Sequence, residues 1–296
     1  MDATDNTILQ LLFMNARATN REIAELTGLS VSAVYKRIKA LEDDHIITDY
    51  IARPSITALN SIPMVIIGRS REVSIEQACH TLGAHDCVFG IAVASGKVLY
   101  VSIMLRNITE LQEVTSFVSR TANLVDPVVG IVSENYSQFP PQLSDYELRI
   151  IKSLNREARK PLSQVAEELG SSTKTVKKNL DTMIEQQKVN FTIEWAPLYR
   201  DSFVSIFHIK TPPGMDIKIE VRELYEAYRE NIIIGVGFAN IPDFILFEVW
   251  THSPRDSQDL LEQLHKRGYV DIIPHILLSI HWYPNWMDEM VQSLGQ

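Results

Sequence analysis

Two short segments combine basic side chains with a regular apolar pattern, and their chemistry is that of phosphate binding. Residues 30–41 contain Lys36, Arg37 and Lys39 and no acidic residue, and residues 171–180 contain three lysines and no acidic residue. Each segment therefore carries a local charge of +3. On a helix that enters a DNA groove, basic side chains reach phosphates while residues at the N-terminus reach base edges. Both segments are candidate DNA-binding helices.

The acidic residues are concentrated outside the parts of the chain that contain these helices. The 296 residues have a formal net charge of −9 and a pI of about 5.4, which argues against a protein that coats nucleic acids without regard to sequence. Residues 1–50 and 143–196 together carry −2, and the rest of the chain carries −7. This distribution fits two small basic faces on an acidic body.

Composition narrows the class of protein further. An apolar content of 45% supports folded cores, and the length predicts two domain-sized units or a larger number of small ones. We find no apolar run long enough to span a membrane and no secretory signal in residues 1–5. Two cysteines cannot form a disulfide framework. We therefore expect a cytoplasmic protein with several domains.

The segments around the two basic helices repeat each other at an offset of 142 residues. Ala16 and Arg17 align with Ala158 and Arg159 without a gap. Most other matched positions are apolar and recur at helical spacing, which predicts two copies of one helical fold. The further matched pairs are Ile8/Ile150, Leu9/Ile151, Leu12/Leu154, Ile23/Val165, Ala24/Ala166, Glu25/Glu167, Gly28/Gly170, Ser30/Ser172, Val34/Val176, Lys36/Lys178, Ile38/Leu180 and Leu41/Met183.

Each copy reads as three short helices followed by a β segment. Gly28 and Gly170 suit the tight turn between the second and third helices, because glycine adopts positive φ without strain. Ser30 and Ser172 are favourable N-caps of the third helix. The β segments at residues 46–50 and 189–193 follow at the place of a wing. The pattern predicts two winged helix-turn-helix domains.

The residues after each helical unit also follow one pattern, β-α-β-β-α-β. In the first copy these elements are predicted at residues 64–67, 74–82, 88–105 (a hairpin), 109–123 and 128–132. In the second copy they are predicted at residues 203–209, 217–228, 232–250, 257–266 and 272–280. This order is typical of a ferredoxin-like αβ sandwich, an α+β fold. Pro140-Pro141 marks the seam between the copies.

The domain boundaries follow from these patterns. We expect winged helix-turn-helix domains at residues 1–55 and 143–196 and ferredoxin-like effector or dimerisation domains at residues 60–139 and 200–284. We expect residues 285–296 to form a C-terminal helical tail.

The first helical unit resembles the DNA-binding domain of the leucine-responsive/asparagine-operon (Lrp/AsnC, feast/famine) regulator family. The motifs that carry the resemblance are Asp5-x-x-Ile8-Leu9, Asn15-Ala-Arg17, Arg21-Glu-Ile-Ala24, Gly28-Leu-Ser30 and Val34-x-x-Arg37-Ile-x-x-Leu41-Glu42. The second unit matches less closely, and the αβ sandwiches match in order and length. The chain therefore resembles two fused family members, and the resemblance implies a transcriptional regulator that binds double-stranded DNA.

The resemblance and the local charge together identify candidate DNA contacts. Arg17 and Arg21 are expected to contact the DNA backbone, and Arg37 either contacts DNA or pairs with an acid such as Asp49. The candidates on the two third helices are Ser30, Ser32, Tyr35, Lys36, Arg37 and Lys39 in the first copy and Thr173, Lys174, Lys177 and Lys178 in the second.

A second family feature implies a ligand site. The effector module of the family commonly has a Gly-x-x-Asp turn in its central hairpin, near the pocket. Asn240, Asp243 and Phe244 supply such an Asp in the second module, whereas residues 95–98 of the first do not. The resemblance implies that an amino acid or similar metabolite binds the second module.

Other reactive residues lack the spacing of a functional site. Cys79-His80 and His85-x-Cys87 do not match a zinc pattern, and the aromatic residues of the last module are interpreted as core or interface packing. His208, His252, His265, His275 and His281 are interpreted as packed or hydrogen-bonded residues without ligand spacing. We expect no metal, no cofactor and no enzymatic activity, since no catalytic motif is present.

Two alternatives remain open at this point. Siroheme decarboxylases resemble the same two-domain unit and work as paired subunits, so the chain is alternatively a tetrapyrrole enzyme. A helix-turn-helix scaffold for protein contacts is the other alternative. Under the main interpretation, the two sandwiches pair sheet to sheet within one chain as a pseudo-dimer, and the protein associates further into homo-oligomers.

Overall fold

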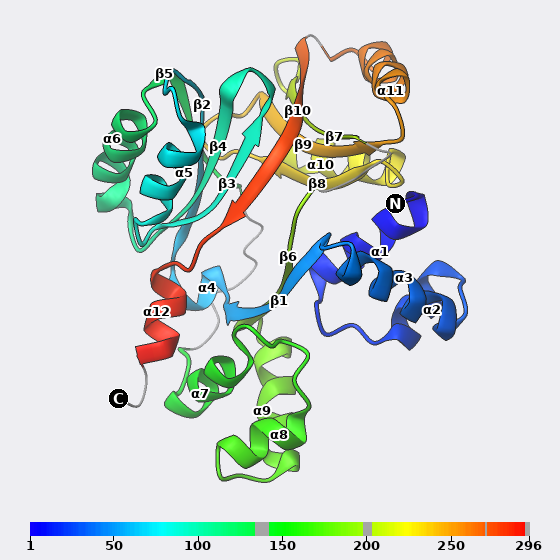
Figure 1. The fold of residues 1–296 in the computed structure, drawn as a ribbon, viewed down its shortest axis with the longest axis vertical. Helices are drawn as coiled ribbons and strands as arrows, with labels where there is room; N and C mark the ends of the chain where they lie inside the picture. The colour runs from blue at the N-terminus through cyan, green and yellow to red at the C-terminus, as the bar shows by residue number, and fades with distance from the viewer. Residues whose placement is uncertain (134–141, 198–202, 270, 294–296) are drawn as a thin grey trace.

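The computed structural model describes residues 1–133, 142–197, 203–269 and 271–293, and it contains both predicted helical units (Figure 1). The first consists of α1 (Ala3–Met14), α2 (Asn20–Thr27), α3 (Val31–Asp43) and β1 (Ile47–Pro54), followed by the short helix α4 (Ile56–Leu59). The second consists of α7 (Asp145–Leu154), α8 (Leu162–Glu168), α9 (Thr173–Glu185) and β6 (Val189–Trp195). In the described residues, no helix is long and apolar enough to cross a membrane.

Local sequence explains where these helices begin and turn. The Ser30 hydroxyl accepts a hydrogen bond from the backbone amide of Ala33, and Ser172 caps α9 in the same way through Thr175. Gly28 has φ of 71° and Gly170 has φ of 61°, so both turns use the conformation that favours glycine. The predicted caps and turns are confirmed.

The two β-α-β-β-α-β modules are also present. The first contains β2 (Ile62–Ser70), α5 (Ile75–Gly83), β3 (Val88–Ala94), η1 (Ser95–Lys97), β4 (Val98–Leu105), η2 (Ile108–Glu110), α6 (Leu111–Thr121) and β5 (Leu124–Ile131). The second contains β7 (Phe203–Lys210), α10 (Ile217–Ala227), β8 (Ile232–Gly237), β9 (Phe244–Thr251), α11 (Pro254–Lys266) and β10 (Asp271–Trp282), and α12 (Trp286–Ser293) follows it. Residues 140 and 141, the predicted seam, lie outside the described residues.

The two sheets face each other and are also joined through their strands. The first half of β10 pairs with β7 and its second half pairs with β3, so β10 joins the two sheets. The resulting strand order is β5-β2-β4-β3-β10-β7-β9-β8 (Figure 1). A bridge between Val132 and Phe238 connects the opposite edges. Ile67 and Tyr100 of the first sheet share a buried core with Ile206 and Trp250 of the second. The predicted sheet-to-sheet pairing within one chain is confirmed.

The β segments after the helical units pair with each other. β1 and β6 form an antiparallel two-stranded sheet in which Tyr50 lies opposite Ile193. The predicted wings are therefore one ribbon shared by both units rather than two separate wings. The helices of both units also pack into one hydrophobic core, in which Ile8 and Ile150 are both fully buried.

Reciprocal arginine contacts strengthen this pairing. The guanidinium of Arg17 donates to the carbonyl oxygen of Ala158, and Arg159 donates to the carbonyl oxygens of Ala16 at 2.8 Å and Ala18 at 3.2 Å. The two arginines occupy equivalent positions in the sequence repeat. The helical units are thus related by an approximate two-fold axis within one chain.

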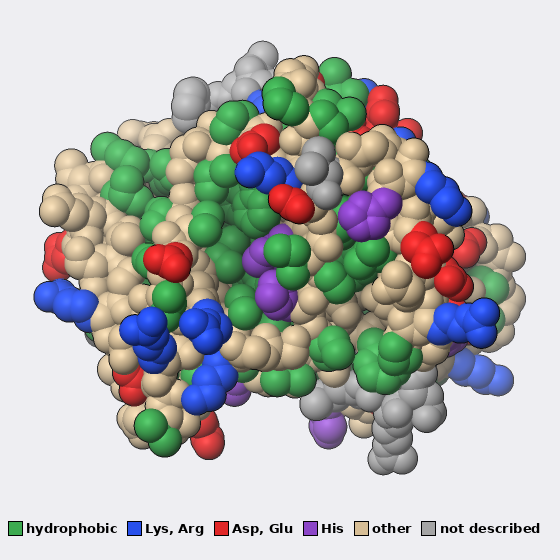
Figure 2. All heavy atoms as spheres, turned by 90° about the horizontal axis from the view of Figure 1, so that it is seen from above, with side chains coloured by type: hydrophobic (Ala, Val, Ile, Leu, Met, Phe, Trp, Pro, Cys, Tyr) green, Lys and Arg blue, Asp and Glu red, His purple; other side chains and the backbone are tan. Residues whose placement is uncertain are grey.

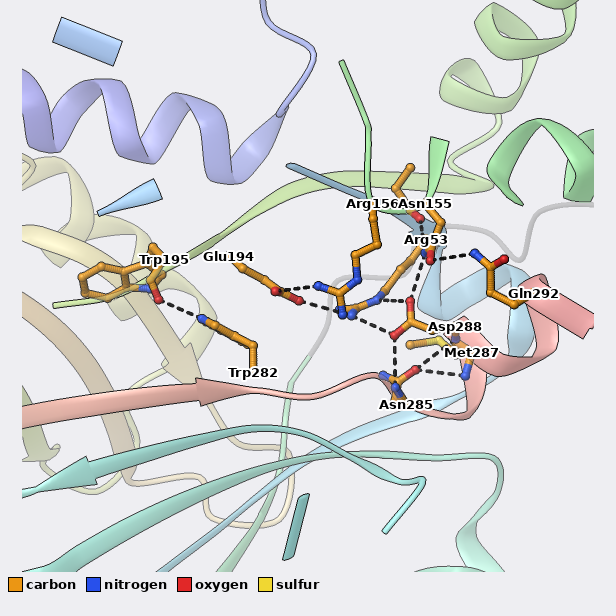
Figure 3. Close-up of polar contacts among 11 residues, drawn as sticks. Arg53, Asn155, Arg156, Glu194, Trp195, Trp282, Asn285, Met287, Asp288 and Gln292 are labelled. Carbon is orange, nitrogen blue, oxygen red and sulfur yellow. Dashed lines mark hydrogen bonds and ion pairs between the residues drawn. The ribbon is translucent and has the colours of Figure 1, made fainter. Parts of the chain in front are cut away.

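The C-terminal helix α12 links the second helical unit to the first sandwich. Asp288 accepts two hydrogen bonds of 2.8 Å from Arg53 of the ribbon and one of 3.0 Å from Asn155 at the end of α7 (Figure 3). Trp286 and Met287 are buried in the core of the first sandwich. The predicted C-terminal helix is confirmed.

Candidate DNA interface and ligand pocket

Helix α3 presents its polar side to solvent because its apolar stripe is used for packing. Val34, Ile38 and Leu41 are buried against α1 and α2. Tyr35, with 57% of its surface exposed, and Lys36 lie on the opposite side. Ser30 and Ser32 at the N-terminus are also exposed and share a hydrogen bond of 3.1 Å. This arrangement suits a helix that enters a major groove.

Two of the predicted DNA contacts on α3 have acidic partners. Lys39 pairs with Asp43 at 2.6 Å, and both side chains are exposed. Arg37 donates to Asp2 at 2.8 Å and to Asp5 at 2.7 Å, so its acidic partners are in α1 and its N-cap rather than at Asp49. The hydrogen bonds that Arg37 donates to Asp5 and Asp2 raise the pKa of Arg37. Arg37 therefore fixes α3 onto α1.

The third helix of the second unit, α9, has a similar exposed side. Thr173, Lys174 and Lys178 are exposed, and neither lysine has an ion pair within the described residues. Lys177 pairs with Asp181 at 2.9 Å on the solvent-exposed surface. Exposed pairs of this kind contribute little stability and are readily exchanged for a phosphate.

The two arginines predicted to contact the DNA backbone differ in their surroundings. Arg21 pairs with Glu25 at 3.0 Å, with both side chains largely exposed, and is free to reorient toward DNA. Arg17 is half-buried and bound to carbonyl oxygens of the second unit. Its position argues against direct DNA contact and assigns it to the pairing of the units.

A pocket of about 300 Å³ lies where the second sandwich meets the edge of the first. It contains two of the three predicted effector residues, Asp243 and Phe244. The Lys210 ammonium lies 4.0 Å from the Asp243 carboxylate. Figure 2 views this end of the molecule and shows a hollow with hydrophobic and histidine side chains in it. The lining residues are Val128, His208, Lys210, Ile241, Asp243, Phe244, Asp271 and Ile273.

The third predicted effector residue, Asn240, has a structural partner instead. Its side-chain amide donates to the carbonyl oxygen of Val129 at 2.8 Å and accepts from the amide of Ile131 at 2.7 Å. Asn240 therefore fixes the loop before Phe244 to strand β5. It positions the pocket and does not line it.

The polar floor of the pocket was not predicted from the sequence. His208 shares a hydrogen bond of 2.7 Å with the Tyr100 hydroxyl of the opposite sheet. Burial and the neighbouring His275 lower the pKa of His208 to about 4, so its imidazole is neutral at pH 7. The sequence indicated that His208 is a packed or hydrogen-bonded strand residue, but gave no sign that it lines a pocket. The sequence also did not identify Lys210 and Asp271 as lining residues. These two are paired across β7 and β10, a register that no local pattern reveals.

Arg106 contacts the cluster formed by His85, Asp86 and Cys87. Ligand atoms of His85, Asp86 and Cys87 lie within 4.8 Å of one another. Arg106 donates to Asp86 and, at 3.2 Å, to Glu110. Burial raises the pKa of the Cys87 thiol to about 12, and metals bind the thiolate. The cluster is therefore an ion-paired element of the first sandwich.

Comparison with known proteins agrees with the helical repeat. A family model described as winged helix-turn-helix DNA-binding matches residues 1–48 and 143–189. The HTH-type transcriptional regulator LrpA of Pyrococcus horikoshii is 27% identical over 132 residues, which is 44% of this chain and 92% of LrpA. LrpA of Pyrococcus abyssi is 26% identical over 132 residues, with the same coverage. Each relative thus corresponds to about half of this chain.

The similarity to a solved siroheme decarboxylase extends over both halves of the chain. The siroheme decarboxylase NirDL has a TM-score of 0.62 and 13% sequence identity, and the match covers 98% of each chain. At this identity the similarity extends to the fold alone. The two-unit architecture therefore occurs in another protein.

Proposed function

Because this chain is a tandem Lrp-like protein, we propose that it is a sequence-specific DNA-binding transcriptional regulator. Its two helical units, which we call the first and second heads, are both DNA-binding domains in this proposal. The observation that carries the proposal is the joint core of the two helical units. The β1–β6 ribbon and the contacts of Arg17 and Arg159 hold the units together while the polar sides of α3 and α9 remain exposed.

The two heads carry different side chains at their exposed positions. The first head presents Tyr35 and Lys36, and the second presents Thr173, Lys174 and Lys178. In a dimer of identical chains, both half-sites are read by the same residues and the operator is a palindrome. A chain with two different heads is suited to an asymmetric operator.

Selection from fragmented genomic DNA at two salt concentrations tests this function. We expect recovered sites that weaken as salt rises, with a slope that falls by about one for each phosphate-contacting lysine that is removed. Lys36→Ala tests the first head and Lys174→Ala/Lys178→Ala tests the second. Lys266→Ala on α11 is the matched control, since it removes an exposed lysine far from both heads in the sequence. Equal binding by all variants contradicts the proposal and favours a scaffold for protein contacts.

We further propose that the pocket at Asp243 binds an amino acid. A zwitterion matches the lining, because Lys210 offers a cation for a carboxylate while Asp243 and Asp271 offer acceptors for an ammonium group. Titration calorimetry with the twenty amino acids tests this assignment. Asp243→Ala is expected to abolish the binding of whichever amino acid binds the parent. If that variant binds every candidate as well as the parent does, the pocket assignment is wrong.

A tetrapyrrole enzyme is the second candidate, and the fold similarity to NirDL over 98% of the chain is the observation that favours it. The pocket composition favours the regulator, because a carboxylate-rich macrocycle requires several cations and Lys210 faces two aspartates there. Incubation with siroheme separates the two functions. A shifted absorption band and release of carbon dioxide support the enzyme, and unchanged spectra exclude it.

A further inference from the structure

A second and larger cavity, of about 600 Å³, lies between the first helical unit and the second sandwich. We call it the α1–α10 groove. It is separate from the pocket at Asp243, with which it shares no residue. Its lining residues are Gln10, Phe13, Met14, Lys218, Ile219, Val221, Arg222, Tyr225, Glu226, Ile233, Ile234 and Gly235.

The groove exposes apolar surface that the rest of the chain leaves uncovered. Met14 at the end of α1 is 77% exposed, and Ile219 on α10 is 45% exposed. One asparagine and one glutamine side chain of α1 connect the two walls of the groove. Asn6 donates to the carbonyl oxygen of Glu230 at 3.0 Å, and Gln10 donates to that of Arg229 at 2.6 Å. The two walls are thus in contact beside an open apolar space.

The equivalent space in the other half of the molecule is filled by the chain itself. The sequence repeat relates α1 to α7, and the module order relates α10 and β8 to α5 and β3. Between α7 and α5, the Tyr283 hydroxyl donates to the carbonyl oxygen of Cys79 at 3.0 Å, and Asp288 accepts from Asn155 at the end of α7. Trp286 is buried against the first sandwich. Two aromatic rings and one carboxylate therefore occupy this position.

The charges of the groove match an acidic occupant. Lys218 and Arg222 lie one turn apart on α10, and neither forms an ion pair with a carboxylate in the described residues. Glu226 is the one carboxylate among the lining residues. An anion bound next to Lys218 and Arg222 is attracted by two positive charges that no carboxylate of the described residues pairs with.

We propose that the α1–α10 groove binds a small amphipathic acid, with an aromatic or aliphatic body and one anionic group. The body covers Met14 and Ile219, and the anion pairs with Lys218 and Arg222. Such a ligand contacts the first DNA-binding head and the second sandwich at once. The ligand therefore acts on the first DNA-binding head from a site that is separate from the pocket at Asp243.

Fluorescence titration with 8-anilinonaphthalene-1-sulfonate, an aromatic sulfonate, tests the proposal on the full chain without DNA. We expect one saturable site from which decanoate displaces the probe. Lys218→Glu/Arg222→Glu and, separately, Ile219→Asp are expected to weaken the site by at least about fivefold, the effect of roughly 1 kcal/mol. All three residues are exposed, so circular dichroism is expected to show unchanged folding.

Matched controls separate this site from general adsorption of the dye. Arg255→Glu reverses a charge on the other helix of the same sandwich, and Ile108→Asp places an acid at a similarly exposed isoleucine of the first sandwich. Unchanged affinity in both controls supports the groove. Equal weakening in controls and groove variants, or probe binding that none of the variants changes, overturns the proposal. Neither result bears on whether α3 and α9 bind DNA.

Discussion

Replacement of Arg53 by methionine tests how strongly the C-terminal helix is fixed to the helical units. Arg53 contacts both carboxylate oxygens of Asp288 at 2.8 Å and Glu194 at 3.4 Å (Figure 3). The exposed fractions of these side chains are 12% for Arg53 and 5% for each acid. Arg53→Met keeps the aliphatic volume and leaves two buried carboxylates without this cation.

The expected loss in the free energy of unfolding is about 3 kcal/mol at pH 7. Removal of one partner from a buried ion pair costs about 3–5 kcal/mol. The lower end applies here because Glu194 retains Arg156 at 2.8 Å and Asp288 retains Asn155 at 3.0 Å. The cost arises from the uncompensated charge rather than from lost packing.

The pH dependence gives this prediction a distinctive sign. Burial by itself raises the pKa of Asp288, but hydrogen bonds and the charge of Arg53 outweigh burial and hold the pKa below its usual value of 3.8. In the parent, this stabilisation is present above pH 3.8 and is lost as pH falls through the lower folded pKa. In Arg53→Met, burial acts without the arginine and the pKa rises. The difference between the two proteins therefore shrinks as pH falls from 7 toward 4.

Urea denaturation followed by tryptophan fluorescence measures both quantities, because Trp195, Trp282 and Trp286 lie close to this cluster. Arg21→Met is the control, since its pair with Glu25 is 82% and 65% exposed and is expected to contribute no more than about 0.5 kcal/mol. If Arg53→Met destabilises no more than Arg21→Met, or if its deficit is the same at pH 4 and pH 7, the reasoning is refuted.

Three further predictions concern a buried carboxyl group, the arginines between the helical units and a glycine turn. Burial raises the pKa of Glu248 to about 7, so the parent loses about 3 kcal/mol of stability as pH rises from 4.5 to 7, and Glu248→Gln is expected to remove this loss in thermal unfolding at pH 5 and pH 8. Arg17→Ala and Arg159→Ala each remove charged hydrogen bonds between the helical units, and each is expected to cost about 1.5–3 kcal/mol in urea denaturation; a clear difference between the two contradicts the approximate two-fold relation. Gly28→Ala is expected to cost about 1 kcal/mol by the same measurement, because φ of 71° strains a Cβ although the surrounding space is open; an unchanged midpoint contradicts this.

Much of the fold could be predicted because it depends on local patterns. The repeat at an offset of 142 residues, the serine caps and the glycine turns are all properties of short segments, and the structure confirms them. Amphipathic spacing identified Val34 and Val176 as buried, since one face of each helix must pack against its neighbours.

The pairing partners could not be predicted from the same patterns. The β segments after α3 and α9 read as two wings, yet they form one ribbon, because each strand edge pairs with whichever edge the packed helices bring near. The residues of the pocket at Asp243 were likewise predictable only where a local motif marked them. Asp243 and Phe244 were recognised from a turn motif, whereas Lys210 and Asp271 meet only through the register of β7 and β10.

The sequence by itself therefore determined that this protein has two basic helix-turn-helix heads and two αβ modules, because caps, turns and periodicity act within a few residues. Only the tertiary structure decided that the heads share one core, that α12 fills one cleft and that the α1–α10 groove stays open. The physical reason is that burial and charge pairing depend on which distant segments become neighbours, and no local spacing encodes that choice.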